Sequence, residues 1–297
     1  MDHELWEAII LGVVQGVTEF LPISSDGHLV IAQAAMKSFG LSSGSDRDHL
    51  HFDVVLHFGT LLAIILVFWR DLAALTSHPR RMLLIVVASI PAALVGFTIK
   101  SRVEESFTQP LVAGVGLLVT SLFLFLGYRA GSVLLRLNRP LRSIDGITTA
   151  DALVIGGAQA LAILPGVSRS GSTISTSVLL GVSRESAAVF SFLMAVPVIG
   201  GAILLVTKDI LEGEGNIGRW DAAALGTVVS FLVGVVALKW LLRILSRGGL
   251  LGFAMYCLVM GTAVIVWQTV SPTPTGAEHA GTGRPPAVVD SSRAGGV

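Results

Sequence analysis

Six long stretches of the chain contain no lysine, arginine, aspartate or glutamate, and this feature limits the fold more than any other. They cover approximately residues 54–69, 82–99, 111–128, 186–207, 222–238 and 248–270. A bilayer core about 30 Å thick takes about 20 apolar residues of helix to cross. Charged residues make up only 13% of the sequence, against about 25% in a soluble domain. We therefore expect an all-α integral membrane protein with six transmembrane helices, whose main partner is the lipid bilayer.

Charge and cysteine content exclude several other classes of protein. The 20 basic and 20 acidic residues cancel, so the chain has no basic excess that would bind nucleic acid. A single cysteine, Cys257, excludes a disulfide framework and any site built from several cysteines. The first residues are acidic rather than basic, so we expect no cleavable signal and place the first apolar stretch in the mature protein.

Two further apolar regions are too short or too interrupted to cross a bilayer. Residues 5–20 contain Glu7 and Glu19 and end before Pro22; residues 151–164 end at Pro165 and are followed by a short run at 173–182. Short apolar segments that stop at proline or glycine are typical of re-entrant hairpins. A non-helical backbone at membrane depth is tolerated only inside protein or beside a watery cavity. Both breaks are therefore candidate parts of a site.

The two interrupted regions also resemble each other. Each has a glutamine (Gln15 or Gln159), an apolar turn, Leu-Pro, and a serine three residues after the proline. We interpret 1–270 as one membrane domain made of two repeats, about 1–137 and 150–270, each with a re-entrant pair followed by three spans. Because three is odd, the second repeat is inverted, which predicts a site near the membrane midplane where the repeats meet. Residues 271–297 are rich in Pro, Gly, Ser and Thr and are predicted to be a disordered tail.

The first break carries groups that suit metal and proton chemistry. Gln15 and Glu19 are four residues apart and share a helix face, and their oxygens suit a hard cation such as Mg²⁺ or Ca²⁺. A carboxylate in a membrane segment is by default a functional-site hypothesis. Ser24 and Ser25 are candidate caps of the next helix, whose free amides attract anions, and His28 is a candidate proton-transfer group.

The second break suits an anion. Residues 165–173 are rich in glycine and serine and contain Arg169 between two apolar half-helices. A guanidinium binds phosphate oxygens through two hydrogen bonds, and hydroxyls with free amides complete such a cradle. Together the two breaks predict metal-assisted attack on a phosphate ester or anhydride.

These two motifs resemble the signature pair of the bacterial undecaprenyl-diphosphate phosphatase family, the bacitracin-resistance type. That family has Glu or Gln, three residues, Glu, then Phe-Leu-Pro-(Ile/Val)-Ser-Ser-x-Gly-His, and later Pro-Gly-x-Ser-Arg-Ser-Gly-x-Thr; residues 15–28 and 165–173 match without a gap. The resemblance covers about 5–270. It implies a hydrolase that releases phosphate from a C55 polyprenyl diphosphate, recycling the lipid carrier for the cell wall. It also implies six spans with two re-entrant pairs in inverted repeats, and dependence on a divalent cation (Mg²⁺ or Ca²⁺).

The resemblance also implies roles for single residues. Catalytic roles fall on Glu19, Ser25, His28 and Arg169, and cation ligation on Gln15 and Glu19. The implied phosphate-binding residues are Ser24, Gly27, Ser168, Ser170, Gly171 and Thr173. Many members have glutamate where this chain has Gln15, so Glu19 is the only carboxylate of that pair. The nucleophile is left open between Ser25, His28 and a metal-bound water.

The sequence contains partial signals for two other functions. A different class of lipid phosphatase forms a phosphohistidine with Ser-Arg-x5-His, but the position six after Arg169 is Ser175, which disfavours it. The alternative that is not an enzyme is a polyprenyl-phosphate flippase, because inverted repeats with broken helices are common in transporters. The sequence leaves a homodimer open.

Basic residues predict the orientation in the membrane. Ten lie in the loops opposite the termini: Arg70, Arg80, Arg81, Arg129, Arg136, Arg139, Arg142, Lys239, Arg243 and Arg247. Six lie on the terminal side, outside the tail: Lys37, Arg47, Lys100, Arg102, Lys208 and Arg219. Because short cytoplasmic loops collect lysine and arginine, we expect a multi-pass protein of the bacterial cell membrane with both termini outside. The site then opens to the extracytoplasmic side.

Overall fold

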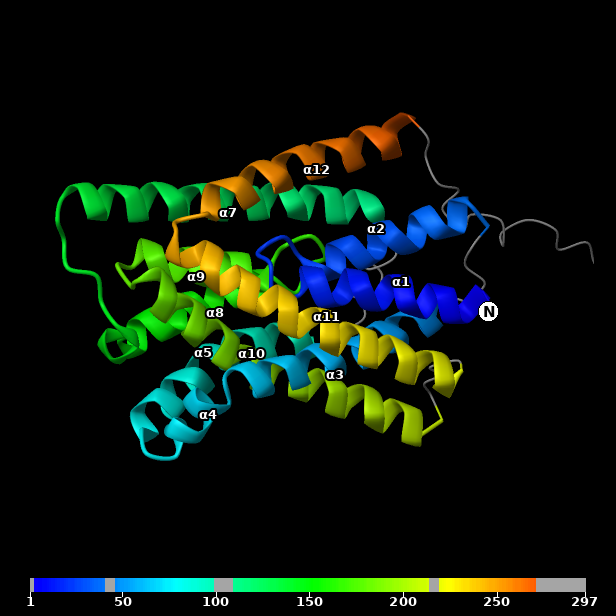
Figure 1. The fold of residues 1–297 in the computed structure, drawn as a ribbon, viewed down its shortest axis with the longest axis horizontal. Helices are drawn as coiled ribbons and strands as arrows, with labels where there is room; N and C mark the ends of the chain where they lie inside the picture. The colour runs from blue at the N-terminus through cyan, green and yellow to red at the C-terminus, as the bar shows by residue number, and fades with distance from the viewer. Residues whose placement is uncertain (1–2, 41–45, 99–108, 214–218, 271–297) are drawn as a thin grey trace, which may run out of the picture.

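A computed structural model describes the chain except for residues 1–2, 41–45, 99–108, 214–218 and 271–297 (Figure 1). The predicted disordered tail lies outside the described residues. The helices, in order, are α1 His3–Thr18, α2 Ser25–Ser38, α3 Asp46–Val67, α4 Trp69–Leu75, α5 Pro79–Thr98, α7 Pro110–Arg136, the 3₁₀ turn η1 Ile144–Gly146, α8 Thr149–Leu161, α9 Arg169–Leu179, α10 Arg184–Leu211, α11 Trp220–Ser246 and α12 Leu250–Val270. The described residues form no strand, so the predicted all-α class is confirmed.

The predicted spans correspond to long apolar helices. Within the described residues, α5, α7, α10, α11 and α12 are each long and apolar enough to cross a bilayer. The helices α3 and α4 form a pair bent by 77° at the break, which counts as a sixth span when the two are taken together. Several of these helices run past their uncharged stretch: α7 continues to Arg136 and α10 begins at Arg184. Arginine at a helix end keeps its aliphatic stem in the apolar layer and its charge in water, so charge-free length underestimates helix length.

Both interrupted regions form hairpins of two helices. In Figure 1, α1 and α2 enter from the end of the bundle where the N-terminus lies, α8 and α9 enter from the opposite end, and their connecting loops lie side by side in the middle. The second hairpin differs from the prediction in one detail, because α9 begins at Arg169 rather than Thr173. The Ser168 side chain accepts a hydrogen bond from the Gly171 backbone N–H and thereby starts the helix four residues earlier.

The two halves of the chain exchange their re-entrant helices. Helix α1 packs on α11, which belongs to the second half, and α8 packs on α5, which belongs to the first. Helices α7 and α12, the last of each half, pack on each other. Neither hairpin is therefore enclosed by its own half, and each loop lies where the two halves meet.

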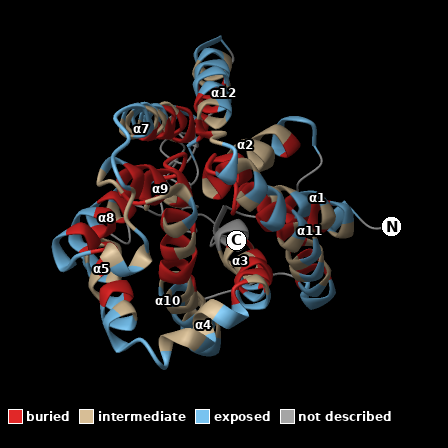
Figure 2. Ribbon diagram, turned by 60° about the vertical axis from the view of Figure 1, so that its left-hand side comes forward, coloured by how far each residue is buried: buried red, intermediate tan, exposed pale blue. Residues whose placement is uncertain are grey.

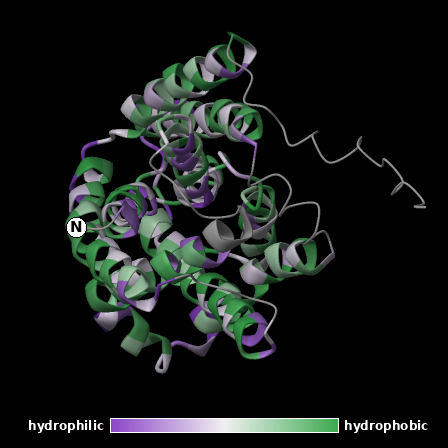
Figure 3. Cartoon of the chain, turned by 90° about the vertical axis from the view of Figure 1, so that its right-hand side faces the viewer, coloured by the Kyte–Doolittle hydropathy of each residue, from purple (hydrophilic) through white to green (hydrophobic). Residues whose placement is uncertain are grey.

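The outer faces of the helices are apolar and exposed, as contact with lipid requires. Leu83, Leu94 and Val236 are examples of large aliphatic side chains that are more than half exposed. Seen from the end at which His3 and Val270 lie, hydrophobic residues cover the outward-facing sides of most helices (Figure 3). Burial is concentrated instead in α9 and the adjoining part of α10 (Figure 2). The polar helix α9 is therefore the centre of the bundle.

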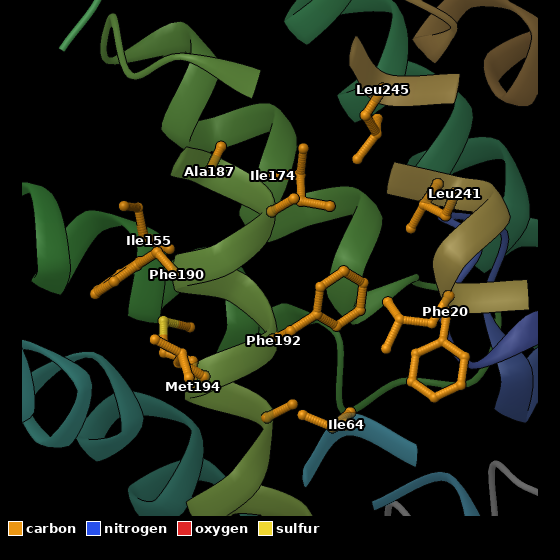
Figure 4. Close-up of a cluster of buried hydrophobic side chains, with 14 of the residues drawn as sticks. Phe20, Ile64, Ile155, Ile174, Ala187, Phe190, Phe192, Met194, Leu241 and Leu245 are labelled. Atoms are coloured by element: carbon orange, nitrogen blue, oxygen red, sulfur yellow. The ribbon is translucent and has the colours of Figure 1, made fainter. Parts of the chain in front are cut away.

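An aromatic cluster fixes the first loop against α10. The Phe20 ring meets the Phe192 ring edge-on, with centroids 5.8 Å apart (Figure 4). The Phe68 ring stacks on Phe192 with centroids 5.7 Å apart. All three side chains are buried. Aromatic pairs of this geometry each add about 0.5–1.5 kcal/mol beyond the area that they bury. Since Phe20 follows Glu19 directly, this cluster positions the residues of the first loop.

Candidate active site

The first loop turns sharply between α1 and α2. Ser24 has a backbone φ of 71°, a left-handed value that is uncommon for residues other than glycine. Its hydroxyl accepts a hydrogen bond from the Gly27 N–H at 3.3 Å and so caps α2. Strained backbone of this kind persists only where the surrounding structure enforces it, and it is concentrated at functional sites.

The second loop is held against α7 by hydrogen bonds. The Thr120 hydroxyl donates to the Gly166 carbonyl at 2.7 Å and accepts from the Ser168 N–H at 2.8 Å. Gly166 has a φ of 88°, which a glycine adopts without strain. A single buried threonine therefore fixes the backbone on both sides of Val167.

The two loops touch through their glycines. A Cβ atom on Gly27 would lie 2.7 Å from the Gly166 Cα, so neither position has room for a side chain. The Ser170 hydroxyl also donates to the Leu21 carbonyl across the same contact, at 3.3 Å. This close approach brings Glu19 and Arg169 together.

Glu19 lies at the centre of the predicted site. Its Oε1 accepts a hydrogen bond from the Arg169 guanidinium at 2.7 Å, and its Oε2 accepts from the Ser25 hydroxyl at 2.6 Å. Gln15 Nε2 donates to the same Oε2 at 3.3 Å. The carboxylate is buried, and the Arg169 side chain is 13% exposed. The structure thus unites four predicted residues, namely Gln15, Glu19, Ser25 and Arg169.

His57 is part of this cluster and was missed by the sequence reasoning. Its Nδ1 hydrogen-bonds the Asp53 carbonyl oxygen at 2.7 Å, while its Nε2 lies 3.4 Å from Glu19 Oε2 and 3.5 Å from Asp26 Oδ1. Both ring nitrogens therefore face acceptors, which an imidazolium with two N–H groups satisfies. The signal was present in the sequence, because His57 is an ionisable residue inside the predicted span 54–69. It was overlooked because the spans were defined only by the absence of Lys, Arg, Asp and Glu.

His28 does not face Ser25. Its Nδ1 lies 2.7 Å from the Ser24 carbonyl oxygen, and its Nε2 lies 2.7 Å from the hydroxyl of Tyr256 on α12. Because a carbonyl oxygen only accepts, Nδ1 carries a proton, and in the neutral ring Nε2 accepts from Tyr256. Tyr256 is a second residue that the sequence reasoning missed, since nothing in an apolar span marks it as the partner of a histidine 228 positions away.

The residues predicted to bind phosphate form the walls of the site. The amides of Gly27 and Gly171 donate to the hydroxyls of their own caps, Ser24 and Ser168, rather than pointing freely at an anion. Thr173 hydrogen-bonds the Arg169 carbonyl and the Ser191 hydroxyl, both at 2.7 Å. Ser168, Ser170 and Thr173 are almost completely buried. Their visible role is to hold the backbone around Arg169.

The oxygens near Gln15 partly suit a hard cation. Gln15 is fully buried and its Oε1 has no hydrogen-bond partner, while its Nε2 is near Glu19 and Thr60. A buried carbonyl oxygen without a partner is costly, and a cation would satisfy it. In the part of the chain that the structure describes, no group of three or more His, Cys, Asp or Glu side chains is arranged to hold a metal. A cation would therefore take its remaining oxygens from a bound phosphate or from water, as Mg²⁺ commonly does.

Comparisons with known proteins show the family of the chain. The family model described as bacitracin resistance protein BacA matches residues 8–263. A curated undecaprenyl-diphosphatase of Rhodopirellula baltica is 41% identical over 267 residues, covering 89% of this chain and 98% of that protein. Those of Halothermothrix orenii and Carboxydothermus hydrogenoformans are 39% and 38% identical, again over 89% of this chain and over 98% and 97% of theirs.

Proposed function

The chain belongs to the family of bacitracin resistance protein BacA, and we propose that it is an undecaprenyl-diphosphatase that hydrolyses undecaprenyl diphosphate to undecaprenyl phosphate and inorganic phosphate. It is a hydrolase of the lipid carrier cycle of cell-wall synthesis. One observation carries this most directly: two loops about 150 residues apart place a guanidinium and a hydroxyl on opposite oxygens of one buried carboxylate.

The Ser25 hydroxyl is the nucleophile that this geometry favours. It already donates to the Glu19 carboxylate at 2.6 Å, the contact of a nucleophile with a base. In the proposed step, the Ser25 oxygen bonds to the terminal phosphorus while its proton passes to Glu19. The bond from that phosphorus to the bridging oxygen breaks, and undecaprenyl phosphate leaves. Water then releases inorganic phosphate from Ser25.

Arg169 stabilises the negative charge of the terminal phosphate. It has donors beyond the two that bind Glu19 and the Ser191 carbonyl, because a guanidinium carries five N–H groups. Preorganised donors of this type are worth about 10²–10³ in turnover. The buried hydroxyls of Ser168, Ser170 and Thr173 hold the backbone around Arg169.

Gln15 and Glu19 are the proposed cation ligands. Asp26 lies close by, because His57 Nε2 is near the carboxylates of both Glu19 and Asp26. When bound, a divalent cation neutralises charge on the phosphate oxygens. His57 holds the Glu19 carboxylate by its Nε2, and His28 remains the proposed proton-transfer group on the side of Tyr256.

The protein is a multi-pass membrane protein, and we propose that its basic end is cytoplasmic. The ten basic residues counted in the sequence lie in or beside α4, the start of α5, the ends of α7 and α11, and η1, at one end of the bundle (Figure 1). Some of them also have structural partners: Arg81 donates twice to Asp145 and keeps the pKa of that carboxyl below its usual value. The first hairpin enters from the opposite end, so the site opens to the extracytoplasmic side.

Phosphate release from C55 polyprenyl diphosphate by purified protein in detergent tests the function. We expect release that depends on an added divalent cation and is lost with a chelator and in Glu19→Gln. A flippase needs a sealed membrane to act, whereas a phosphatase does not. Protein that is folded in detergent and releases no phosphate, yet moves polyprenyl phosphate across sealed vesicles, would reverse the assignment.

A further inference from the structure

An apolar cavity of about 540 Å³ lies between the first hairpin and helices α11 and α12. Val17, Leu21 and Ile23 form its wall on the first hairpin, and Ile244, Phe253 and Tyr256 form its wall on α11 and α12. The hydroxyl of Thr18, which also lines it, donates to the Val14 carbonyl at 2.7 Å. The Tyr256 hydroxyl is therefore the polar group of the cavity lining that contacts the candidate active site, through His28.

The cavity is open toward lipid because its two outer helices diverge. Helix α11 packs on α1 and α3, whereas α12 packs on α7. Figure 1 shows the two helices separating from the short connection between Ser246 and Leu250, with α1 and α2 between them. Trp240 on α11 is about half exposed at this opening.

One side chain, Tyr256, connects the cavity with the candidate active site. Tyr256 lines the cavity and its hydroxyl lies 2.7 Å from His28 Nε2, with the two rings stacked at a centroid distance of 5.7 Å. Leu21 and Ile23 belong to the same loop as Glu19 and Ser24. A molecule whose phosphate occupies the site therefore has an apolar surface directly beside it.

We propose that this cavity binds the isoprenoid segment of the substrate that is adjacent to the diphosphate. The proposal rests on the proposed function and names a part of the substrate site. The volume falls in the range of about 300–1,000 Å³ that small-molecule pockets occupy, and the lining is apolar apart from the groups described above. Bulk lipid also fits an apolar surface, but it would not account for the contact between Tyr256 of the cavity and His28 of the candidate active site.

This placement orients the diphosphate. The terminal phosphate lies toward Ser25 and Arg169, and the phosphate that stays on the lipid lies toward His28 and Tyr256. The lipid-linked phosphate is the leaving group, so His28 is on the side where the bridging oxygen takes up negative charge. Tyr256 is a positioning residue that holds the His28 ring in this direction.

Filling the cavity tests the proposal. A Cβ atom on Gly252, which lines the cavity, would meet no heavy atom within 4 Å, so there is open space at this position into which Gly252→Leu adds volume. Gly201 in the spanning helix α10 is equally open and lies outside the cavity, which makes Gly201→Leu the matched control. The substrates are diphosphates with C5, C15 and C55 chains, and the readouts are KM and kcat.

We expect Gly252→Leu to raise KM for the C15 and C55 diphosphates about tenfold or more and to raise it less for the C5 diphosphate, whose single isoprene unit fills less of the cavity. Withholding two or three methylene-sized groups from an apolar site costs about this much affinity. Gly201→Leu should match the wild type on all three. Equal kinetics of the two variants on the C55 substrate would overturn the proposal while leaving the phosphatase assignment intact. A wild type inactive on the C55 substrate would instead overturn the proposed function.

Tyr256→Phe separates positioning from chain binding. It keeps the apolar wall but removes the hydroxyl that contacts His28. We expect a drop in kcat that is the same for every chain length, with KM little changed. A loss that grows with chain length would show that Tyr256 acts through the chain alone and would contradict its role in positioning His28.

Discussion

The guanidinium of Arg169 donates a hydrogen bond to the carboxylate of Glu19 at 2.7 Å, although 150 residues separate them in the chain. Glu19 follows the end of α1 and Arg169 is the first residue of α9, so each lies where the two helices of a hairpin are connected. The two hairpins enter the bundle from opposite ends (Figure 1). The contact therefore depends on both halves of the chain being folded. It is also the contact on which the chemistry of the site depends most.

Arg169→Lys should lose most of the activity although it keeps the positive charge. Lysine is a point charge without the planar fork, so it cannot bind Glu19, the Ser191 carbonyl and a phosphate together. We expect turnover to fall about 10²-fold or more, measured as phosphate release from the C55 substrate. Arg129→Lys, at an exposed position on α7, is the control and should be as active as wild type. Near-normal turnover in folded Arg169→Lys would show that the guanidinium does not bind the phosphate.

Glu19→Gln and Gln15→Glu should have opposite effects on cation dependence. Glu19→Gln removes the carboxylate that Arg169 and Ser25 contact, and we expect little activity at any cation concentration. Gln15→Glu places a second carboxylate in a fully buried position 3.3 Å from the first, which a cation would neutralise. This variant should stay active at saturating Mg²⁺ or Ca²⁺, and its melting temperature should rise more on cation addition than that of the wild type. A melting temperature that does not respond to cation would argue against a site at Gln15.

Ser25→Ala tests the nucleophile. If Ser25 attacks phosphorus, its loss should lower turnover at least about 10³-fold, and acid-quenched wild-type protein should carry a phosphoryl group on Ser25 detectable by mass spectrometry. Retention of a tenth or more of the activity in Ser25→Ala, with no phosphorylated serine in the wild type, would assign the attack to water.

Variants of His57 test whether its N–H donor, rather than only its volume, supports activity. His57→Leu leaves the buried Glu19 and the nearby Asp26 without their shared partner, which is costly in a low-dielectric interior. We expect lower thermal stability and about a hundredfold loss of kcat. His57→Gln keeps an N–H donor and should recover activity to within about tenfold of wild type. Equal activity of both variants would mean that the histidine contributes only its volume.

Thiol labelling checks the orientation. Cys257 is buried, so Cys257→Ala provides a cysteine-free background, and Ser77 and Glu212 are exposed positions at opposite ends of the bundle. In intact cells an impermeant thiol reagent should label Glu212→Cys and spare Ser77→Cys. The reverse pattern would place the basic end outside.

The class of fold and the chemical groups of the site follow from the order of residues along the chain. Charge-free length predicts the spans because lipid excludes charge, and Leu-Pro breaks in short apolar segments predict the hairpins because an open backbone at that depth must be enclosed by protein. Gln15, Glu19 and Arg169 are predicted from these breaks, the catalytic role of Ser25 is implied by the family resemblance, and the structure brings the four residues together. The predicted start of α9 at residue 173 is wrong, because the run of serine and glycine before it resembles a loop in sequence. In the structure Ser168 caps the helix, which begins at Arg169.

Which of these groups meet depends on how the two hairpins pack against each other and against α3 and α12. His28 contacts Tyr256 beside the apolar cavity. His57, which was not predicted as a site residue, lies beside Glu19 instead. The amides expected to bind an anion are occupied by their own caps. The physical reason is that spacing along one helix specifies a shared face, whereas contacts between hairpins from opposite ends of a bundle depend on how closely two backbones approach. In this protein that approach is set by Gly27 against Gly166, two positions that no local pattern connects.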